Sequence, residues 1–195
     1  MKLFEEGFIE RNKKVIITAI LIMFISAIIG AGMGYIYNGD KLNFISNALS
    51  SNPVNNNVST ASSSISLFIH NFIVDFLTII GGLIFSIFSF AVTVFNGISI
   101  GYVFGFDLKF ACSTILPHAI LEYTAGALSL AIAFKLTKIE IDIIKKRNFK
   151  NTIKEHNIDF KDILSIFVVM VILLAVAAVI EGHITPLIAM WAYGL

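Results

Sequence analysis

The long, nearly charge-free apolar runs of this chain constrain its fold more than any other feature. The stretch between Lys14 and Lys135 carries few charged residues, namely Asp40, Lys41, Asp75, Asp107, Lys109 and Glu122. The runs between them are long enough for bilayer spans, which need roughly 20 apolar residues each. Only 14% of the 195 residues are charged, against about a quarter in soluble domains. The sequence therefore predicts an all-α, polytopic transmembrane helical bundle that forms a single integral membrane domain over residues 1–195.

We expect about five membrane-spanning helices. The apolar run 65–104 is about twice the length of one span, and the pair Gly81-Gly82 divides it, because glycine pairs favour turns. The expected spans cover residues 15–37, 65–80, 83–104, 111–136 and 163–180. For residues 65–80, which are few for a full span, three placements remain open: spanning, re-entrant and interfacial.

The basic residues predict how the spans are oriented. Seven Lys or Arg residues lie in segment 137–161 and four in segment 1–14, so the positive-inside rule places both segments in the cytoplasm. Residues 1–14 are then a cytoplasmic interfacial segment, and 137–161 is a cytoplasmic basic loop. The Asn/Ser-rich segment 38–64 is expected to be an external loop. Residues 187–195, which follow an interruption at Gly182 and Pro186, are expected to be an interfacial tail. The protein is thus predicted to be a multi-pass protein of the cell membrane.

Glycines at regular spacing predict close contact between helices. Helices in lipid associate where small residues let their backbones approach. Gly97, Gly101 and Gly105 are four residues apart and share one helix face, and Gly30 and Gly34 form a second pair at the same spacing. Such faces serve either contacts within one chain or a homodimer. The expected helix-packing residues are Gly97, Gly101, Gly105 and Pro117.

A set of polar residues is predicted to form a cluster inside the bundle. His118 and Glu122 are four residues apart and lie on the same side of one helix. The predicted topology places Asn71, Asn96 and Glu181 at a similar depth, in the outer half of the membrane. Polar groups within lipid need each other or enclosed water, and an intramembrane carboxylate indicates a site. The alternative interpretation is that these residues only hydrogen-bond helices together.

Three motifs in this chain, NGISIG, LPHAILEYTAGALSL and EGHITP, resemble those of the stage II sporulation protein M family of integral membrane proteins. Its Asn-Gly and Gly element is matched by Asn96, Gly97 and Gly101. The Leu-Pro-His-Gly element with a later Glu is matched by Leu116, Pro117, His118 and Glu122, with Ala119 replacing Gly. The late Glu…Thr-Pro element is matched by Glu181, Thr185 and Pro186, with Gly182 and His183 replacing a small and an aromatic residue. Asn71 matches an asparagine of the preceding helix. The resemblance covers most of the chain after Ser64.

The resemblance implies a membrane-embedded helical bundle with a scaffolding role. Sporulation members of the family look like scaffolds for cell-wall hydrolases during engulfment. The first functional hypothesis is therefore a membrane scaffold or assembly partner that contacts the lipid bilayer and other membrane proteins, or itself as a homodimer. No catalytic residue is implied.

Two alternative functions use the polar cluster. In the first, His118 and Glu122 are spaced so that both can reach one metal ion, as in a metal-dependent hydrolase, and Glu181 is the third candidate ligand. Intramembrane carboxylates also serve as ion sites in carriers of ions or small solutes. The sequence has no HExxH motif and no Ser/His/Asp set, which favours a protein that is not an enzyme. No cofactor is expected other than such a metal ion.

Composition excludes some other classes of function. A net charge of +1 and the lack of a basic–aromatic pattern give no indication of nucleic-acid binding. Cys112 is the only cysteine, so an internal disulfide cannot form.

Overall fold

The computed structural model describes residues 4–36 and 60–194, and for residues 60–63 it describes the backbone only. The part of the expected external loop before residue 60 lies outside the described residues. The helices are α1 (Phe8–Ile36), α3 (Thr60–Ile80), α4 (Ile87–Phe106), α5 (Leu108–Thr114), α6 (Leu116–Lys146), α7 (Phe149–Glu155), α8 (Asn157–Val179) and α9 (Thr185–Tyr193). The described residues contain no β-strand, so the predicted all-α bundle is confirmed.

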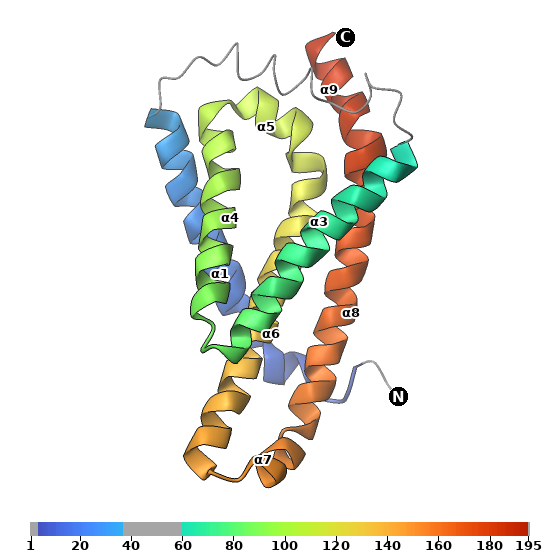
Figure 1. Ribbon diagram of the computed structural model, residues 1–195. Helices are drawn as coiled ribbons and strands as arrows, with labels where there is room; N and C mark the ends of the chain where they lie inside the picture. The colour runs from blue at the N-terminus through green and yellow to red at the C-terminus, as the bar shows by residue number, and fades with distance from the viewer. Residues whose placement is uncertain (1–3, 37–59, 195) are drawn as a thin grey trace.

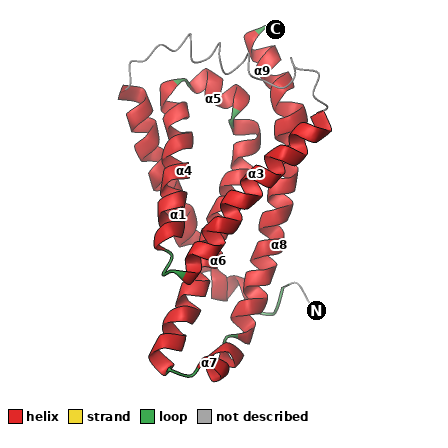
Figure 2. Cartoon of the chain, in the orientation of Figure 1, coloured by secondary structure: helices red, strands yellow, loops and turns green. Residues whose placement is uncertain are grey.

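The long helices run between the two ends of the bundle, α3 slants across the others, and the short helices α5 and α7 lie at the two ends (Figure 1). α1 packs beside α4, and α6 packs beside α8. α5 lies at one end, near the C-terminus, whereas α7 lies at the opposite end. Figure 2 shows that the loops between consecutive helices from α3 to α9 are short.

α6 forms the buried centre of the bundle. All residues from 125 to 133 are buried, and most of them are alanine, glycine or serine. On one side, Leu128 and Ile132 pack in a core with Ile79 of α3 and Met170 of α8. On another side, α6 packs against Ala19 and Met23 of α1. Small side chains let three long helices approach α6 closely.

Four helices of the described residues are long and apolar enough to cross a membrane: Phe8–Ile36, Ser64–Leu83, Ile87–Phe106 and Asn157–Tyr193. α6, which was expected to be a further span, is enclosed by them. The face of α1 that packing leaves uncovered is apolar; Ile17, Phe24 and Ile28 are 53%, 60% and 57% exposed. An apolar outer surface of this kind suits lipid and supports a membrane-embedded protein.

Several helix boundaries differ from those expected. α3 begins at Thr60 rather than at residue 65, and it ends at a 3-10 turn (Gly81–Leu83), where the glycine pair predicted a break. The segment expected to be a basic loop, 137–161, is mostly helical because α6 continues to Lys146 and α7 and α8 follow closely. Ile139 is buried in this extension, so apolar packing prolongs α6 beyond the apolar run.

The C-terminal interruption is a π-helical turn rather than a break. Residues Ile180–Ile184 form this turn and connect α8 directly to α9. Pro186 is tolerated because it lies at the start of α9, where a missing backbone N–H costs little. The expected interfacial tail therefore continues the helix of α8.

The glycines at regular spacing bring α1 and α4 into backbone contact. A Cβ atom added to Gly101 would lie 2.0 Å from the carbonyl oxygen of Ala27, and one added to Gly105 would lie 1.9 Å from that of Ala31. From the other helix, a Cβ on Gly30 would lie 2.1 Å from the carbonyl oxygen of Ile98. The two glycine faces thus meet each other within one chain.

Substitution of Gly101 should separate the two helices. We expect Gly101→Ala to lower the free energy of unfolding by about 1–3 kcal/mol, the usual cost of overpacking, because backbone atoms of Ala27 occupy the position of the new methyl group. Gly32→Ala is the matched control, since no other atom lies within 4 Å of a Cβ at Gly32. Thermal unfolding in detergent measures both changes. If Gly101→Ala were as stable as Gly32→Ala, the close α1–α4 contact would be wrong.

Candidate functional site

His118 lies in the first turn of α6, where the chain changes direction after α5. The helices α5 and α6 meet at Ile115, and Pro117 occupies one of the first two positions of α6. Proline fits there because its fixed backbone angle suits a helix start. The side chain of His118 is buried, and its Nδ1 lies 3.2 Å from the hydroxyl of Thr185 on α9. The start of α6 and the start of α9 therefore hold the imidazole between them.

Glu122 follows one turn later on the same face of α6. Nδ2 of Asn71 on α3 donates a hydrogen bond to Oε1 of Glu122. This bond gives the carboxylate a donor inside the bundle, where an unpaired one would be costly. It also joins α3 to α6 at the level of the site.

Glu181 reaches the site from the π-helical turn between α8 and α9. A π-turn holds one more residue than an α-helical turn and rotates the side chains that follow, and such turns are frequent at functional sites. Oε1 of Glu181 lies 3.9 Å from Nε2 of His118. The next residue, Gly182, is buried against α3, where a Cβ would lie 2.1 Å from Oγ of Ser64. Glycine is therefore needed for this turn to pack against α3.

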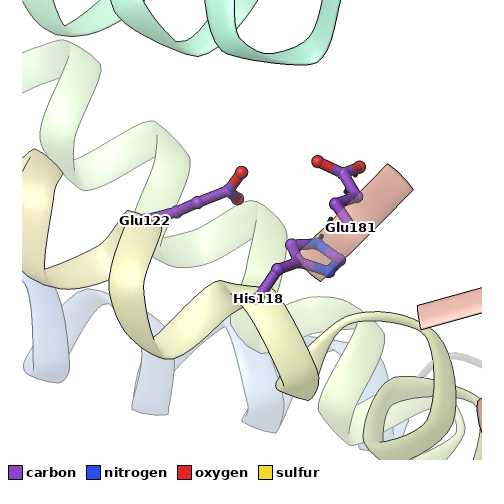
Figure 3. Close-up of side chains that lie close together, drawn as sticks. All are labelled: His118, Glu122 and Glu181. Carbon is purple, nitrogen blue, oxygen red and sulfur yellow. Dashed lines mark ion pairs between the residues drawn. The ribbon is translucent and has the colours of Figure 1, made fainter. Parts of the chain in front are cut away.

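These three side chains form the centre of the candidate site (Figure 3). His118 and Glu122 project from α6 toward Glu181 on the opposite segment. One nitrogen or oxygen atom of each residue lies within 4.8 Å of the corresponding atoms of the other two. This triad, His118, Glu122 and Glu181, offers one imidazole nitrogen and two carboxylates to a common point.

Asn96 does not join the triad but lines a cavity beside it. The cavity has a volume of about 170 Å³ and lies between α3, α4 and α6. Its polar wall is formed by His70, Asn71, Asp75, Asn96, Ser99, Glu122 and Tyr123. The structure thus gathers the triad and Asn71 in direct contacts and places Asn96 at the adjoining cavity.

Asp75 is a cavity residue that the sequence analysis did not include in the polar cluster. Its side chain is only 6% exposed, and Oδ1 accepts a hydrogen bond from the Ser129 hydroxyl at 3.2 Å. Oδ2 has no hydrogen-bond partner among the described residues. The sequence shows an isolated carboxylate in an apolar run. Because it left three placements open for residues 65–80, it did not predict which way the Asp75 side chain faces. His183, by contrast, is exposed and contacts Ser64 instead of the triad.

The glycine-packed helices support the site through Tyr123. Its hydroxyl donates a hydrogen bond of 3.1 Å to the carbonyl oxygen of Gly97. Tyr123 follows Glu122 directly on α6, so this bond ties the site's central helix to α4. The packing glycines consequently position the site without lining it.

A second polar network lies at the α7 end of the bundle. Arg11 makes two hydrogen bonds to Asp162, at 2.9 and 2.8 Å. Asn12 donates to the same carboxylate, and the buried Lys135 donates to Asn12 and to Asp159. These contacts join α1, α6 and α8, and their fully paired charges indicate a structural role.

Long apolar helices around a buried polar triad define an integral membrane protein of the helical-bundle class. The chain belongs to the stage II sporulation protein M family, whose model matches residues 14–186. It is also similar to an uncharacterized protein of Methanocaldococcus jannaschii, with 34% identity over 131 residues that cover 64% of this chain and 71% of the relative. No solved structure matches the chain.

The Asn71–Glu122 hydrogen bond can be tested by a double-mutant cycle. We expect Asn71→Leu and Glu122→Leu to be coupled by about 0.5–1.7 kcal/mol in unfolding free energy, the range for hydrogen bonds between membrane helices. The matched control pairs Glu122→Leu with Thr124→Val, because the Thr124 hydroxyl bonds to Ile120 of its own helix. Unfolding in detergent measures both cycles. Equal coupling in the two cycles would contradict the contact.

Proposed function

We propose that this membrane protein binds a divalent transition-metal ion at the triad, with Zn²⁺ as the best match. The observation that carries the proposal is the convergence of one imidazole and two carboxylates within 4.8 Å of one another. Zinc in proteins takes nitrogen and oxygen ligands at about 2.0–2.2 Å, so small movements of these side chains would bring all three into its coordination shell. Catalytic zinc sites commonly use three protein ligands.

The groups around the triad support this assignment. Metal-bound histidines usually bond through their second ring nitrogen to a neighbouring group, and that bond orients the ring. Thr185 contacts Nδ1 of His118, which leaves Nε2 facing Glu181. Asn71 supports Glu122 in the same way, by donating to one of its oxygens.

Charge balance also favours a divalent cation. Ionised carboxylates are expensive inside an apolar bundle unless a positive charge accompanies them. No Lys or Arg forms an ion pair with Glu122 or Glu181 in the part of the chain that the structure describes. Two carboxylates would together neutralise one divalent ion.

The chemistry supported by such a site is hydrolysis. A bound zinc ion would supply Lewis acidity and lower the pKa of a coordinated water. His118, Glu122 and Glu181 would hold the ion, and the polar cavity beside Glu122 is large enough for water. A metal-dependent hydrolase of the membrane is therefore the enzyme activity that this arrangement would support.

Metal content tests the proposal directly. Protein purified in detergent without chelators should contain close to one zinc per chain by elemental mass spectrometry, and His118→Ala and Glu181→Gln should each lose most of it. The matched control is His183→Ala, an exposed histidine on the same π-turn. Metal-free wild-type protein, or equal zinc in His118→Ala and wild type, would refute the site.

We also propose that the α7 end of the bundle faces the cytoplasm. The basic residues of segment 137–161 lie at this end, and so does Arg11 of α1. Their ion pairs are Arg11 with Asp162, Lys138 with Asp159 and Lys146 with Glu155. Five crossings, by α1, α3, α4, α6 and the helix from α8 to α9, would then place the N-terminus inside and the C-terminus outside. The triad would lie toward the outer surface.

A second candidate function is a scaffold or assembly partner. It is favoured by an apolar groove of about 440 Å³ between α1, α4 and α6. Small residues line it, including Ala27, Ala31, Gly101 and Ala119. Small residues suit the close approach of a further transmembrane helix, from another membrane protein or from a second copy.

Photo-crosslinking in native membranes tests this assembly role. A crosslinking amino acid at Ile120, which lines the groove and is 61% exposed, should yield a discrete protein adduct. Phe95 on α4 is the matched position, since it is 69% exposed and lies outside the groove. An adduct at twice the chain mass would identify a second copy, and other masses a different partner. Only lipid adducts at Ile120 would rule the assembly role out.

A further inference from the structure

The cavity beside the triad contains a carboxylate whose charge no described group balances. Asp75 lies at its wall, is 6% exposed, and has one oxygen without a hydrogen-bond partner among the described residues. An uncompensated charge at this depth is strongly disfavoured in an apolar bundle. Either a proton or a bound cation must accompany the carboxylate.

The cavity wall also contains oxygen groups of the kind that a hard cation prefers. Sodium, calcium and magnesium ions take oxygen ligands from carboxylates, amide carbonyls and hydroxyls. Asn96 and Ser99 supply such oxygens in the cavity wall, and the Ser129 hydroxyl already contacts Asp75. The amide nitrogen of Asn71 is engaged by Glu122, which leaves its carbonyl oxygen for another partner. No Lys or Arg lines the cavity among the described residues.

We propose that the cavity between α3, α4 and α6 binds a monovalent cation, Na⁺, with Asp75 as its charged ligand. The proposal rests on the proposed function in one respect: a divalent metal at the triad neutralises Glu122, so Asp75 is the single charge left to balance. The cavity volume of about 170 Å³ admits an ion together with water. This site is separate from the triad, although Asn71 and Glu122 form the wall between them.

A Na⁺ site would tie three helices together. Asp75 comes from α3, Asn96 from α4 and Ser129 from α6. An ion that binds the folded bundle and not the unfolded chain stabilises the fold in proportion to its concentration. The stability of the folded bundle should therefore report on Na⁺ binding.

The test is thermal unfolding of the purified, zinc-loaded protein in detergent. The unfolding midpoint should rise by several degrees as NaCl replaces choline chloride at constant ionic strength. Asp75→Asn should abolish the rise, and Ser129→Ala, a milder change, should move it to higher Na⁺ concentrations. Glu140→Gln is the matched control, because Glu140 is a carboxylate of α6 that contacts the backbone of Phe85 outside the cavity. It should respond to Na⁺ as the wild type does.

Two results would overturn the proposal. Equal midpoints in NaCl and choline chloride, with a rise only on acidification, would show that Asp75 carries a proton. An undiminished Na⁺ response in both Asp75→Asn and Ser129→Ala would place the ion elsewhere. Zinc content separates this result from failure of the triad: Asp75→Asn should keep zinc and lose the Na⁺ response, whereas failure of the triad would appear as zinc-free wild-type protein.

Discussion

The burial of the middle of α6, where residues 125–133 are enclosed by other helices, is the constraint on which the rest of the structure depends. A helix in this position can carry polar residues only where other helices supply their partners. Toward one end of α6, Lys135 donates hydrogen bonds to Asn12 and Asp159. Near the middle, Ser129 donates to Asp75, and toward the other end Glu122 accepts from Asn71. Each polar position on α6 thus fixes how a neighbouring helix is rotated and how far it is shifted along the axis.

Small residues make this arrangement possible because they bring the backbones together. The α1–α4 contact uses glycines from both helices, and a Cβ at Gly82 would lie 2.6 Å from the Cα of Ala133 on α6. In lipid the packing of such faces replaces the hydrophobic effect that would hold a soluble bundle together. The glycine faces are therefore occupied within the chain, and residues at the edge of this contact, such as Ala27 and Gly101, also line the groove beside Ile120.

The two ends of α6 differ in how completely their charges are paired. At the α7 end, Arg11, Asn12, Lys135 and Asp159 share their hydrogen bonds with one another or with Asp162, and such closed networks hold helices in register. At the α5 end, two carboxylates and an imidazole converge without a Lys or Arg from the described residues, among which the neighbouring Asp75 also has one oxygen without a partner. An arrangement with unbalanced negative charge is costly for folding alone, which is why we assign ligands to this end and a structural role to the other.

The sequence by itself determined the class of protein, the approximate positions of the helices and most residues of the site. These follow from hydropathy and helical spacing, which are local properties. For example, His118 and Glu122 share a face of any α-helix, whatever the tertiary fold. The tertiary structure decided what depends on pairing between distant segments. It set the partner of the Gly97–Gly101 face, which the spacing alone left open between α1 and a second chain. It also decided that the interruption near Gly182 is a π-turn that directs Glu181 to His118, and that Asp75 faces the cavity, because the rotation of one helix about its axis is fixed only by the helices packed against it.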